Sequence, residues 1–389
     1  MLTLVANPGT ASRKYALYDG EDFRIGLHFE YESGRVVCTI TKPTDQQKQD
    51  TDLSNISEAS DRVMQIIAEH GAKQDDEQIG KIGVRLVAPS ALFLHDQIMN
   101  DETLSQLENL RSHAPMHIDA TLQEIRKLRD DFPEVTIVGV SDSAFHTEKP
   151  DFTWNYGLPL YDTDRLEIKR FGYHGISLAA VVRNLRRLEK LSAKLIVCHI
   201  GSTVSVTALH ESRSVDTTMG FSPLDGLVMA TRSGSVDPAA ILYLKRSLDL
   251  DDSQLELYLN EQSGLQGLSC TSSDIRDLLS YESEDHRAAL ALQVYVYGIQ
   301  KAIGQMTAAV GGVDMLVFTG VVGERSAIIR ERILKPFHYL DLMLDAKENS
   351  ECVSPSSVTC ISHLAHSRPI YVIPTDEADE IARRANDMS

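Results

Sequence analysis

The chain has 389 residues, of which 42% are hydrophobic, and it carries a formal net charge of −18. Its length suits two domains of ordinary size, and its apolar content is enough for a well-filled core, which argues against global disorder. A surface this acidic repels phosphate backbones and anionic membranes, so we expect neither nucleic acid nor a membrane among its partners.

Cysteine usage and the start of the chain indicate the compartment. The five cysteines include no C-x-x-C pair, so structural zinc and a disulfide framework are both disfavoured. The chain begins without the basic and apolar regions that precede a cleavage site, and its sequence has no apolar run long enough to span a bilayer. We therefore expect a soluble, cytoplasmic protein.

The first half of the sequence alternates strand and helix patterns. Residues 2–6 are typical of a buried strand ending at a turn, and residues 13–18 of its hairpin partner. Residues 41–60 are polar and are expected to form a loop and a helix start. The other expected elements are a helix at 60–70, a strand at 79–87, helices at 101–110 and 119–128, and a strand at 135–140.

The second half follows a loop rich in proline and aromatic residues at 149–163. A polar, loop-rich connection is expected at 345–368. Because a hairpin opens each half, the alternation predicts mixed α/β structure rather than a plain parallel sheet. The expected strands are 195–200, 315–319 and 370–373, and the expected helices are 177–188, 285–310, 327–334 and 377–385.

An internal repeat favours a duplicated architecture. Residues 5–17 align with residues 197–209 at an offset of 192, which pairs Gly9 with Gly201 and Ala16 with Ala208. Each copy is typical of a strand, a Gly-Ser/Thr turn and a second strand. Two unrelated hairpins with common residues are the alternative, but a duplicated domain explains the shared register better.

The two glycine-containing turns are candidate phosphate sites. Glycine lets the backbone approach a phosphate closely, and exposed N–H groups form an anion-binding nest. Most such turns only reverse the chain, so each one alone is a weak signal. The sequence has no Gly-x-x-x-x-Gly-Lys-Ser/Thr segment and does not indicate a P-loop protein.

Charged residues within or after predicted strands are candidate catalytic groups. Arg85 lies in an apolar strand, where a charge needs a partner, and both a structural ion pair and an anion site satisfy that need. Asp142 and Glu377 each follow a strand end, where a carboxylate can hold Mg²⁺. Glu377 is equally explained as an acidic residue in the first turn of a helix.

Two glycine-rich segments carry a histidine and an arginine. His174 lies between glycines at an expected strand-to-helix turn. It either donates to an oxyanion from an open position or begins a helix without a partner. Residues 216–234 are glycine-dense and almost uncharged until Arg232, which suits bidentate contact with phosphate or carboxylate.

Taken in this order, the segments resemble the acetate and butyrate kinase family from Asn7 to about Ala385. The start Asn7-x-Gly-Thr-x-Ser-x-Lys14 is similar to the family's first signature, and Asp216 to Gly234 is similar to its central signature. Each match alone is weak, whereas their conjunction is specific. Further matches occur in the expected order at 171–177, 272–277, 318–320 and 372–377.

The resemblance implies an α/β fold, namely a duplicated actin-like ATPase or ribonuclease H-like fold with an active-site cleft between two domains. It places the N-terminal domain at 1–146, completed by the C-terminal helix 377–389, and the C-terminal domain at 147–376. The implied activity is reversible phosphoryl transfer between ATP and a short-chain carboxylate such as acetate, with Mg²⁺ or Mn²⁺ as cofactor. The resemblance also implies a homodimer built through the C-terminal domain.

The family's functional residues carry over to the matching positions of this chain. The implied catalytic residues are Asn7, Arg85, His117, Asp142, His174 and Arg232, and the implied metal-site residues are Asn7 and Glu377. The implied carboxylate pocket consists of Arg85, Val87, Met116, Tyr173 and Pro223. The nucleotide is expected at Thr10, Ser12, Lys14, His199, Gly201, Ser202, Asp274, Arg276, Gly320, Gly323 and Glu324.

The chain departs from the family pattern mainly on the nucleotide side. The family's Gly-Asn-Gly loop is Gly201-Ser202-Thr203 here, and its Gly-Ile-Gly-Glu-Asn is replaced by Val-Val-Gly-Glu-Arg at 321–325. Ser235 replaces the aspartate that ends the central signature. The chain is then an acetate-type kinase, a kinase with another acid or donor (propionate, butyrate or pyrophosphate), or an idle paralogue that binds a nucleotide, a metabolite or a partner protein. The retained acceptor and transfer residues favour the first hypothesis.

Tyr173 stands where the family usually has phenylalanine. Its extra hydroxyl is expected at the pocket rim, where it either bonds a polar substituent of the acid or reaches solvent. We expect acetate and propionate to be substrates, with acetate or a short hydroxylated acid preferred over butyrate. On this interpretation, Tyr173→Phe leaves acetate turnover nearly intact.

Overall fold

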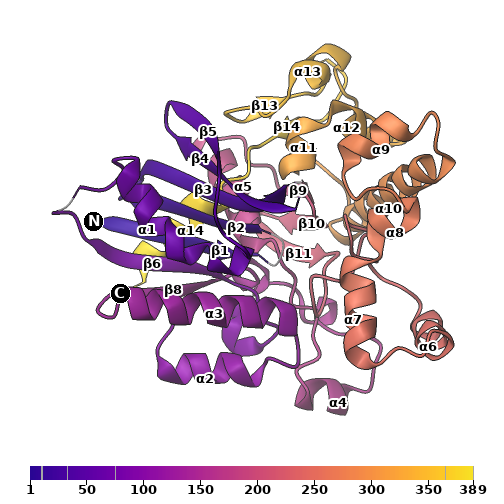
Figure 1. Cartoon of the computed structure of the whole chain (residues 1–389). Helices are drawn as coiled ribbons and strands as arrows, with labels where there is room; N and C mark the ends of the chain where they lie inside the picture. Colours follow the sequence, from indigo (N-terminus) through magenta and orange to yellow (C-terminus); the bar gives the residue numbers. More distant parts are fainter. Residues whose placement is uncertain (10–11, 33, 75, 364, 389) are drawn as a thin grey trace. The chain divides into compact units, whose positions relative to one another are not determined.

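The computed structural model describes residues 1–9, 12–32, 34–74, 76–363 and 365–388, without the side chains of residues 115–117. The chain divides into two units, each built on its own sheet (Figure 1). Unit 1 comprises Met1–Ala144 and Asp376–Ser389, and unit 2 comprises Phe145–Thr375. In the described ranges, no helix combines the length and the apolar character needed to cross a bilayer.

Unit 1 is a mixed sheet with the strand order β5-β4-β3-β2-β1-β6-β8-β7. Strands β1 to β5 form successive antiparallel pairs, whereas β1, β6 and β8 run parallel. The three parallel strands therefore end at the same edge of the sheet. The bounds are β1 (Leu2–Pro8), β2 (Ser12–Asp19), β3 (Asp22–Glu32), β4 (Arg35–Lys42), β5 (Asp45–Asp50), β6 (Ile79–Leu86), β7 (Gln97–Ile98) and β8 (Thr136–Ser141).

Unit 2 has the strand order β11-β10-β9-β12-β14-β13. Its first three strands pair antiparallel, and β9, β12 and β14 run parallel. The orders β3-β2-β1-β6-β8 and β11-β10-β9-β12-β14 are thus the same topology repeated. The bounds are β9 (Lys194–Ile200), β10 (Val204–His210), β11 (Arg213–Thr217), β12 (Met315–Thr319), β13 (Thr359–Cys360) and β14 (Ile370–Val372).

The register of the two opening hairpins refines the repeat found in the sequence. The offset of 192 residues maps β1 (Leu2–Pro8) onto β9 (Lys194–Ile200) from end to end. In the first hairpin Leu4 pairs with Leu17, and in the second Ile196 pairs with Ala208. Leu17 is therefore equivalent to Ala208 rather than to Leu209, so the alignment of the return strands is wrong by one residue.

Helices cover both faces of the unit 1 sheet because its strands alternate their side chains between the faces. Leu4, Ala6 and Ile82 pack in one cluster with residues of α1 and α3. On the opposite face, α14 lies so close that a Cβ at Gly83 would collide with Ile381. The long helices of the unit are α1 (Ser60–Glu69), α2 (Asp101–Asn109), α3 (Pro115–Asp131) and α14 (Glu377–Asp387).

In unit 2, α5 packs its residues Leu178, Val181 and Leu185 against β9 and β12. The long α10 contacts β9, β10 and β11, and α8, α9 and α12 pack against α10. The helices are α4 (Leu160–Arg165), α5 (Gly175–Arg187), α6 (Pro238–Ser247), α7 (Asp252–Glu261), α8 (Gly264–Ser269), α9 (Ile275–Tyr281), α10 (His286–Ala309), α11 (Val321–Arg325), α12 (Ala327–Leu334) and α13 (Ala346–Glu351).

The two units exchange helices along the chain. Helix α5 is the first long helix after β8 of unit 1, but it packs in the core of unit 2. Helix α14 follows β14 of unit 2, but it packs on β1, β6 and β8 of unit 1, where Figure 1 shows it beside these strands. Each sheet is therefore completed by a helix that the chain delivers from the other sheet.

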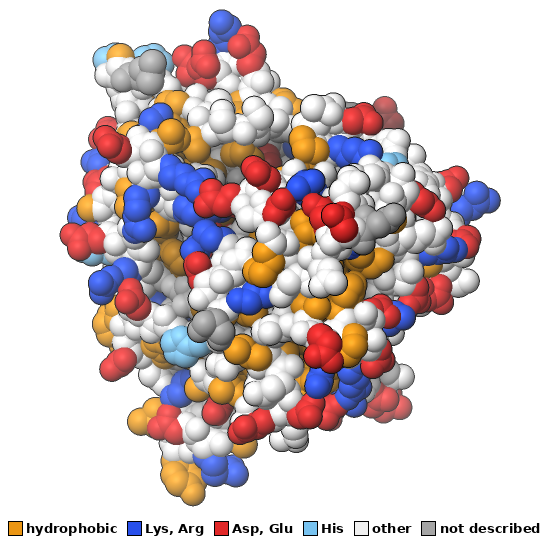
Figure 2. Space-filling view, turned by 90° about the vertical axis from the view of Figure 1, so that its left-hand side faces the viewer, with side chains coloured by type: hydrophobic (Ala, Val, Ile, Leu, Met, Phe, Trp, Pro, Cys, Tyr) orange, Lys and Arg blue, Asp and Glu red, His pale blue; other side chains and the backbone are white. Residues whose placement is uncertain are grey.

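Two expectations for local structure are wrong. Residues 41–60 contain strand β5 (Asp45–Asp50), and residues 345–368 contain α13 and β13. Every residue of β5 is exposed, so its sequence lacks the apolar alternation by which a strand is recognised. On the face drawn in Figure 2, basic side chains lie interspersed with acidic ones.

Candidate functional site

Unit 1 brings three predicted residues together at the carboxyl ends of its parallel strands. Asn7 and Arg85 are the penultimate residues of β1 and β6, and Asp142 follows the last residue of β8. These three strands are neighbours in the sheet. Parallel pairing brings the ends of neighbouring strands to one edge, so residues far apart in sequence become adjacent there.

Arg85 is the centre of this cluster. Its Nη2 donates to Asp142 Oδ2 at 2.8 Å, and its Nη1 donates to Asn7 Oδ1 at 3.4 Å. The Asp142 side chain is fully buried, whereas the Arg85 side chain is 22% exposed. The arginine is thus anchored from beneath by a carboxylate and keeps part of its surface available for an anion.

The charge state of Arg85 is set by opposing effects. Burial lowers its pKa, but the carboxylates of Asp142 and Glu377 outweigh burial, so that the pKa lies above its usual value. Arg85 therefore stays a cation at any pH at which the protein is folded. The expectation that a charge in this strand has a partner is confirmed, and the partner is Asp142.

Glu377, in the first turn of α14, joins the cluster through Asn7. The Asn7 side-chain amide donates from Nδ2 to Glu377 Oε2 at 3.1 Å, while its oxygen accepts from Arg85. The side-chain amide of Asn7 thus links Glu377 to Arg85. Mg²⁺ is commonly held by one or two carboxylates together with water and substrate phosphates, and Glu377 fits that donor set. Among the described residues, no group of three metal-binding side chains is present.

A second ion pair fixes the segment that carries Asp142. Arg384 of α14 donates from Nε to Asp96 Oδ2 at 2.9 Å and contacts its other oxygen through Nη2. Asp96 accepts from the Ser141 backbone N–H at 2.8 Å, and Arg384 donates to the Ser141 carbonyl at 3.0 Å. Both peptide groups of Ser141 are therefore held next to Asp142. Sequence reasoning missed both residues.

In unit 2, His174 is buried and bonded at both ring nitrogens. It precedes α5 with a left-handed backbone conformation at φ 61° and is 3% exposed. Its Nδ1 lies 2.9 Å from Ser205 Oγ, and its Nε2 lies 2.9 Å from Thr203 Oγ1. The alternatives of an open position and of a histidine without a partner are both wrong, because two hydroxyls hold the ring.

His199 lies directly beside His174. The two rings stack with centroids 4.0 Å apart, and His199 Nδ1 lies 2.9 Å from Ser177 Oγ. In the adjoining turn, the Gly201 N–H donates to the Thr203 carbonyl at 3.0 Å, and the Ser202 carbonyl accepts from the Ala230 N–H at 3.1 Å. This part of unit 2 therefore joins predicted residues of the phosphate loop to the predicted catalytic histidine.

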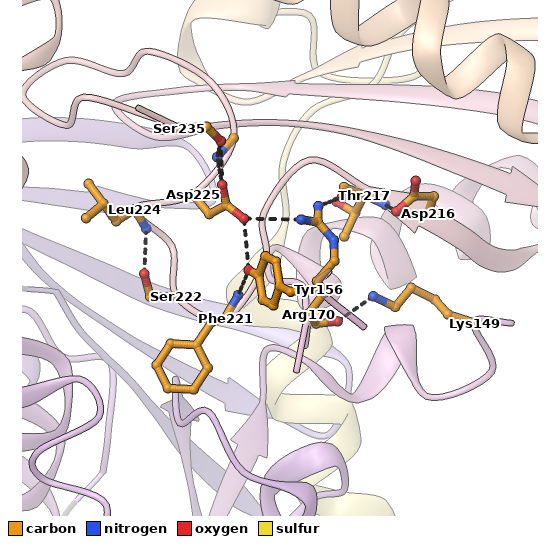
Figure 3. Close-up of polar contacts among 11 residues, drawn as sticks. Lys149, Tyr156, Arg170, Asp216, Thr217, Phe221, Ser222, Leu224, Asp225 and Ser235 are labelled. Atoms are coloured by element: carbon orange, nitrogen blue, oxygen red, sulfur yellow. Dashed lines mark hydrogen bonds and ion pairs between the residues drawn. The ribbon is translucent and has the colours of Figure 1, made fainter. Parts of the chain in front are cut away.

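The hydroxyl of Tyr173 has a different role from the expected one. Tyr173 is 1% exposed, and its OH donates to the Phe221 carbonyl at 2.6 Å. The expectation that it reaches solvent or a substituent of the acid is therefore wrong. The same residue, Phe221, donates its N–H to the Tyr156 hydroxyl at 2.8 Å (Figure 3). Phe221 lies two positions before Pro223 in the predicted carboxylate pocket.

Arg232 lies in a tightly packed part of the central segment. Its carbonyl accepts from the Met229 N–H at 3.0 Å, and Gly264, at φ 63°, sits against its backbone. A Cβ at Gly264 would collide with Met229 and Arg232. The side chain of Arg232 is half-buried and has further contacts within the structure. This packing fixes the backbone that carries the arginine.

The predicted nucleotide residues of unit 2 form two separate groups. Gly320, at φ 82°, donates its N–H to the side chains of Glu324 and Thr375, and Glu324 Oε1 also accepts from the Thr375 N–H at 2.8 Å. Asp274 caps α9 and pairs with the exposed Arg276 at 2.5 Å, and these hydrogen bonds lower the pKa of Asp274. Glu324 therefore stabilises the turn after β12. Gly323 lies just after this turn.

The remaining predicted residues fall in or near the unit 1 sheet. Val87 is buried directly after β6, and Lys14 is exposed on β2, paired in register with Asn7. Ser12 begins β2 and is half-buried. Thr10 lies outside the described residues. Met116 and His117 belong to the first turn of α3, but their side chains also lie outside the described part of the structure.

Comparisons with known proteins give one consistent answer. Residues 2–383 match the acetokinase family. The chain is 36% identical over 396 aligned positions to an acetate kinase of Bacillus thuringiensis, with 98% of this chain and 97% of the relative covered. It is 33% identical over 398 positions to an acetate kinase of Clostridium botulinum, with both chains covered completely.

Solved structures agree. A propionate kinase from Francisella tularensis superposes with a TM-score of 0.89 at 30% identity and complete coverage of both chains. An acetate kinase from Porphyromonas gingivalis superposes with a TM-score of 0.86 at 29% identity, covering 100% of this chain and 99% of the neighbour. With the repeated strand order, this confirms the duplicated actin-like, ribonuclease H-like α/β fold. The chain belongs to the acetokinase family.

Proposed function

We propose that the protein catalyses reversible phosphoryl transfer from ATP to acetate or another short carboxylate. In the forward direction, a carboxylate oxygen attacks the γ-phosphorus, the bond from that phosphorus to the bridging oxygen of ADP breaks, and acyl phosphate and ADP leave. The observation that carries this proposal is the Arg85 cluster, a permanent cation held by buried Asp142 at the ends of three parallel strands.

The proposed roles follow from charge and anchoring. Phosphoryl transfer asks the protein mainly to position the reactants and to neutralise charge on the transferred group. Arg85 and Arg232 are proposed to bind the carboxylate and the transferring phosphoryl. His174, bonded on both sides by hydroxyls, is proposed to orient the same group. His117 is proposed to lie beside it.

Mg²⁺ is the proposed metal. Glu377 is the residue proposed to hold it, with Asn7 fixing the carboxylate through the Nδ2 contact at 3.1 Å. When bound, the ion would neutralise negative charge on the nucleotide phosphates. A titration of activity against Mg²⁺ and Mn²⁺, in wild type and Glu377→Gln, tests the assignment. An unchanged metal dependence in the variant would contradict it.

The activity is tested by trapping acyl phosphate with hydroxylamine in the presence of ATP and Mg²⁺. Acetate, propionate and butyrate are compared, and we expect turnover with acetate and propionate exceeding that with butyrate. Folded protein that turns over none of the three would reject the proposal. Tight nucleotide binding by calorimetry in such a protein would instead identify an idle paralogue.

The phosphoryl donor needs its own test because the chain differs from the family on the nucleotide side. Val321 is 53% exposed, and Arg325 donates from Nε to Ser354 Oγ at 3.1 Å, so both alter the surface beside Gly323. A panel of ATP, GTP and pyrophosphate at fixed acetate separates an ATP-dependent kinase from one with another donor. We expect saturation by ATP in the micromolar-to-millimolar range that is usual for enzymes.

We also propose a homodimer formed through unit 2. Helices α6 and α7 contain no buried residue among those described, although α6 is rich in apolar side chains. Leu242, Tyr243 and Leu257 are 57%, 69% and 42% exposed. Large exposed apolar side chains on a folded protein are typical of an interface, and a second copy is the proposed occupant. Sedimentation of the wild type and of Leu242→Glu distinguishes a dimer from a monomer.

A further inference from the structure

The backbone of Phe221 is held from both sides by tyrosine hydroxyls. Its carbonyl accepts from Tyr173 OH at 2.6 Å, and its N–H donates to Tyr156 OH at 2.8 Å. Tyr173 and Pro223 are both proposed pocket residues, and Pro223 lies only two positions after Phe221. Phe221 therefore connects Tyr173, through a hydrogen bond, and Pro223, through the backbone.

Tyr156 is itself held in place by a charged pair (Figure 3). Its hydroxyl donates to Asp225 Oδ2 at 3.0 Å, and its ring lies 5.2 Å from the guanidinium carbon of Arg170. Arg170 donates from Nη1 to the same Asp225 oxygen at 3.3 Å and from Nη2 to the Thr217 carbonyl at 3.2 Å. The tyrosine is thus fixed both through its hydroxyl and through the face of its ring.

The second oxygen of Asp225 holds the other end of the segment. It accepts from the Gly226 N–H at 2.8 Å and from the Ser235 hydroxyl. Asp225 therefore receives donors from four different residues, and one carboxylate organises the chain from Phe221 to Ser235. Space is equally limited, because a Cβ at Gly220 would collide with Tyr156 OH and Asp225.

The hydroxyl of Tyr156 stays protonated over the working range of the protein. Burial, and next the negative charge of Asp225, raise its pKa to about 12. Because the hydroxyl donates its proton to Asp225, its oxygen accepts from Phe221 at every physiological pH. The connection from Asp225 to Phe221 therefore passes through a permanently protonated group.

We propose that Tyr156 is a positioning residue that sets which carboxylic acids fit the pocket, by holding Phe221 between Tyr173 and Pro223. The proposal rests on the function proposed above. An apolar pocket gains only about 1–3 kcal/mol of discrimination for each methylene, so it must be rigid to reject a longer acid. A segment released at Phe221 widens the pocket and lowers that discrimination.

The test compares kcat/KM for acetate and butyrate in wild type, Tyr156→Phe and Ser235→Ala. Tyr156→Phe keeps the ring over Arg170 and removes only the hydroxyl, so the protein stays folded. We expect the acetate-to-butyrate ratio to fall about 5- to 10-fold, part of the discrimination of about 10- to 200-fold that each of the two extra methylenes of butyrate contributes. Ser235→Ala is expected to act in the same direction by a smaller factor. Tyr339→Phe is the control, since Tyr339 is 72% exposed.

Hydrogen exchange of residues 217–226 gives a second readout that does not require turnover. We expect faster exchange in Tyr156→Phe and unchanged exchange in Tyr339→Phe. An active wild type whose acid preference is unchanged by Tyr156→Phe overturns the proposal and leaves the function standing. A wild type that forms no acyl phosphate rejects the proposed function, and unchanged exchange in the variant then overturns the role of Tyr156 independently.

Discussion

The surroundings of Arg85 in unit 1 and of Lys149 in unit 2 shift the pKa values of these two cations in opposite directions. Arg85 of unit 1 lies against two carboxylates, which raise its pKa despite burial. Lys149 of unit 2 is 4% exposed, donates to the Arg170 carbonyl at 2.6 Å and lies 4.6 Å from the centre of the Trp154 ring. Burial lowers the pKa of Lys149 to about 8, with Asp216 opposing that change and Arg170 adding to it.

The contrast shows two surroundings for a cation, one made of carboxylates and the other of a carbonyl and an aromatic ring. A cation that must meet phosphate or carboxylate needs its own anions beneath it, because otherwise burial would remove its proton. A lysine that only closes a loop tolerates a neutral state.

The largest effect is expected at Arg85. Arg85→Ala removes the preorganised cation and its ion pair with the buried carboxylate of Asp142. We expect acyl-phosphate formation to fall about 10²- to 10³-fold, by analogy with the loss of one charge-stabilising donor. Arg24→Ala is the matched control, since Arg24 pairs with Asp19 at 2.7 Å on the surface. Comparable losses in both variants would show that the effect is not specific to the cluster.

At Lys149, the comparison is tested by the pH dependence of the unfolding free energy. Between about pH 8 and 10.5 the unfolded chain keeps the lysine proton while the folded protein releases it, so unfolding free energy rises with pH. The rise attributable to Lys149 is at most about 3 kcal/mol, and Lys149→Met removes it. Denaturant unfolding at pH 7 and pH 10 in both proteins measures the difference. If the unfolding free energy depended on pH equally in the wild type and in Lys149→Met, the assignment would be contradicted.

A smaller effect is expected from the pair that holds the Asp142 segment. Arg384→Lys keeps the charge but loses the two-nitrogen contact with Asp96, so Ser141 shifts and Asp142 with it. We expect kcat to fall about 10-fold through misplacement of the Arg85 cluster. Arg383→Lys, on the same helix but paired with Glu380 and Asp387 rather than with Asp96, should leave kcat unchanged. If Arg384→Lys lost stability but kept the full kcat, the role of Arg384 would be structural only.

The smallest effect is expected at Thr203. Thr203→Val keeps the shape of the side chain and removes the hydroxyl 2.9 Å from His174 Nε2. One neutral hydrogen bond contributes about 1 kcal/mol, so turnover should fall about 5-fold, and Thr203→Ser should retain it. Faster turnover in Thr203→Val than in wild type would mean that the Thr203 hydroxyl competes with the substrate for His174.

Local sequence patterns were sufficient for the elements with clear periodicity. Strand β12 (Met315–Thr319) and helix α12 (Ala327–Leu334) have the predicted bounds. Strand β5 was missed because all of its residues are exposed, so pairing with β4, rather than burial, makes it a strand. Pairing between distant segments is not encoded in local periodicity.

The contacts of the candidate site could likewise be predicted only in part from the sequence. The need of Arg85 for a partner followed from the cost of burying a charge, which left both an ion pair and a bound anion open. Arg384 could not have been found, because it contacts Asp96 across 288 residues of sequence. The Tyr173 hydroxyl was misplaced because its acceptor is a backbone carbonyl of Phe221, 48 residues away, and a carbonyl carries no residue-specific signal.

The exchange of helices between the sheets has a consequence for biosynthesis. During translation, residues 1–375 are synthesised before the segment Asp376–Ser389, which belongs to unit 1. Until then, the face of β6 at Gly83 lacks Ile381 and Ala385, which cover it in the finished protein. The sheet of unit 1 is therefore covered only after all of unit 2 has been synthesised, and a nascent chain that lacks α14 exposes an apolar surface of the kind that chaperones bind.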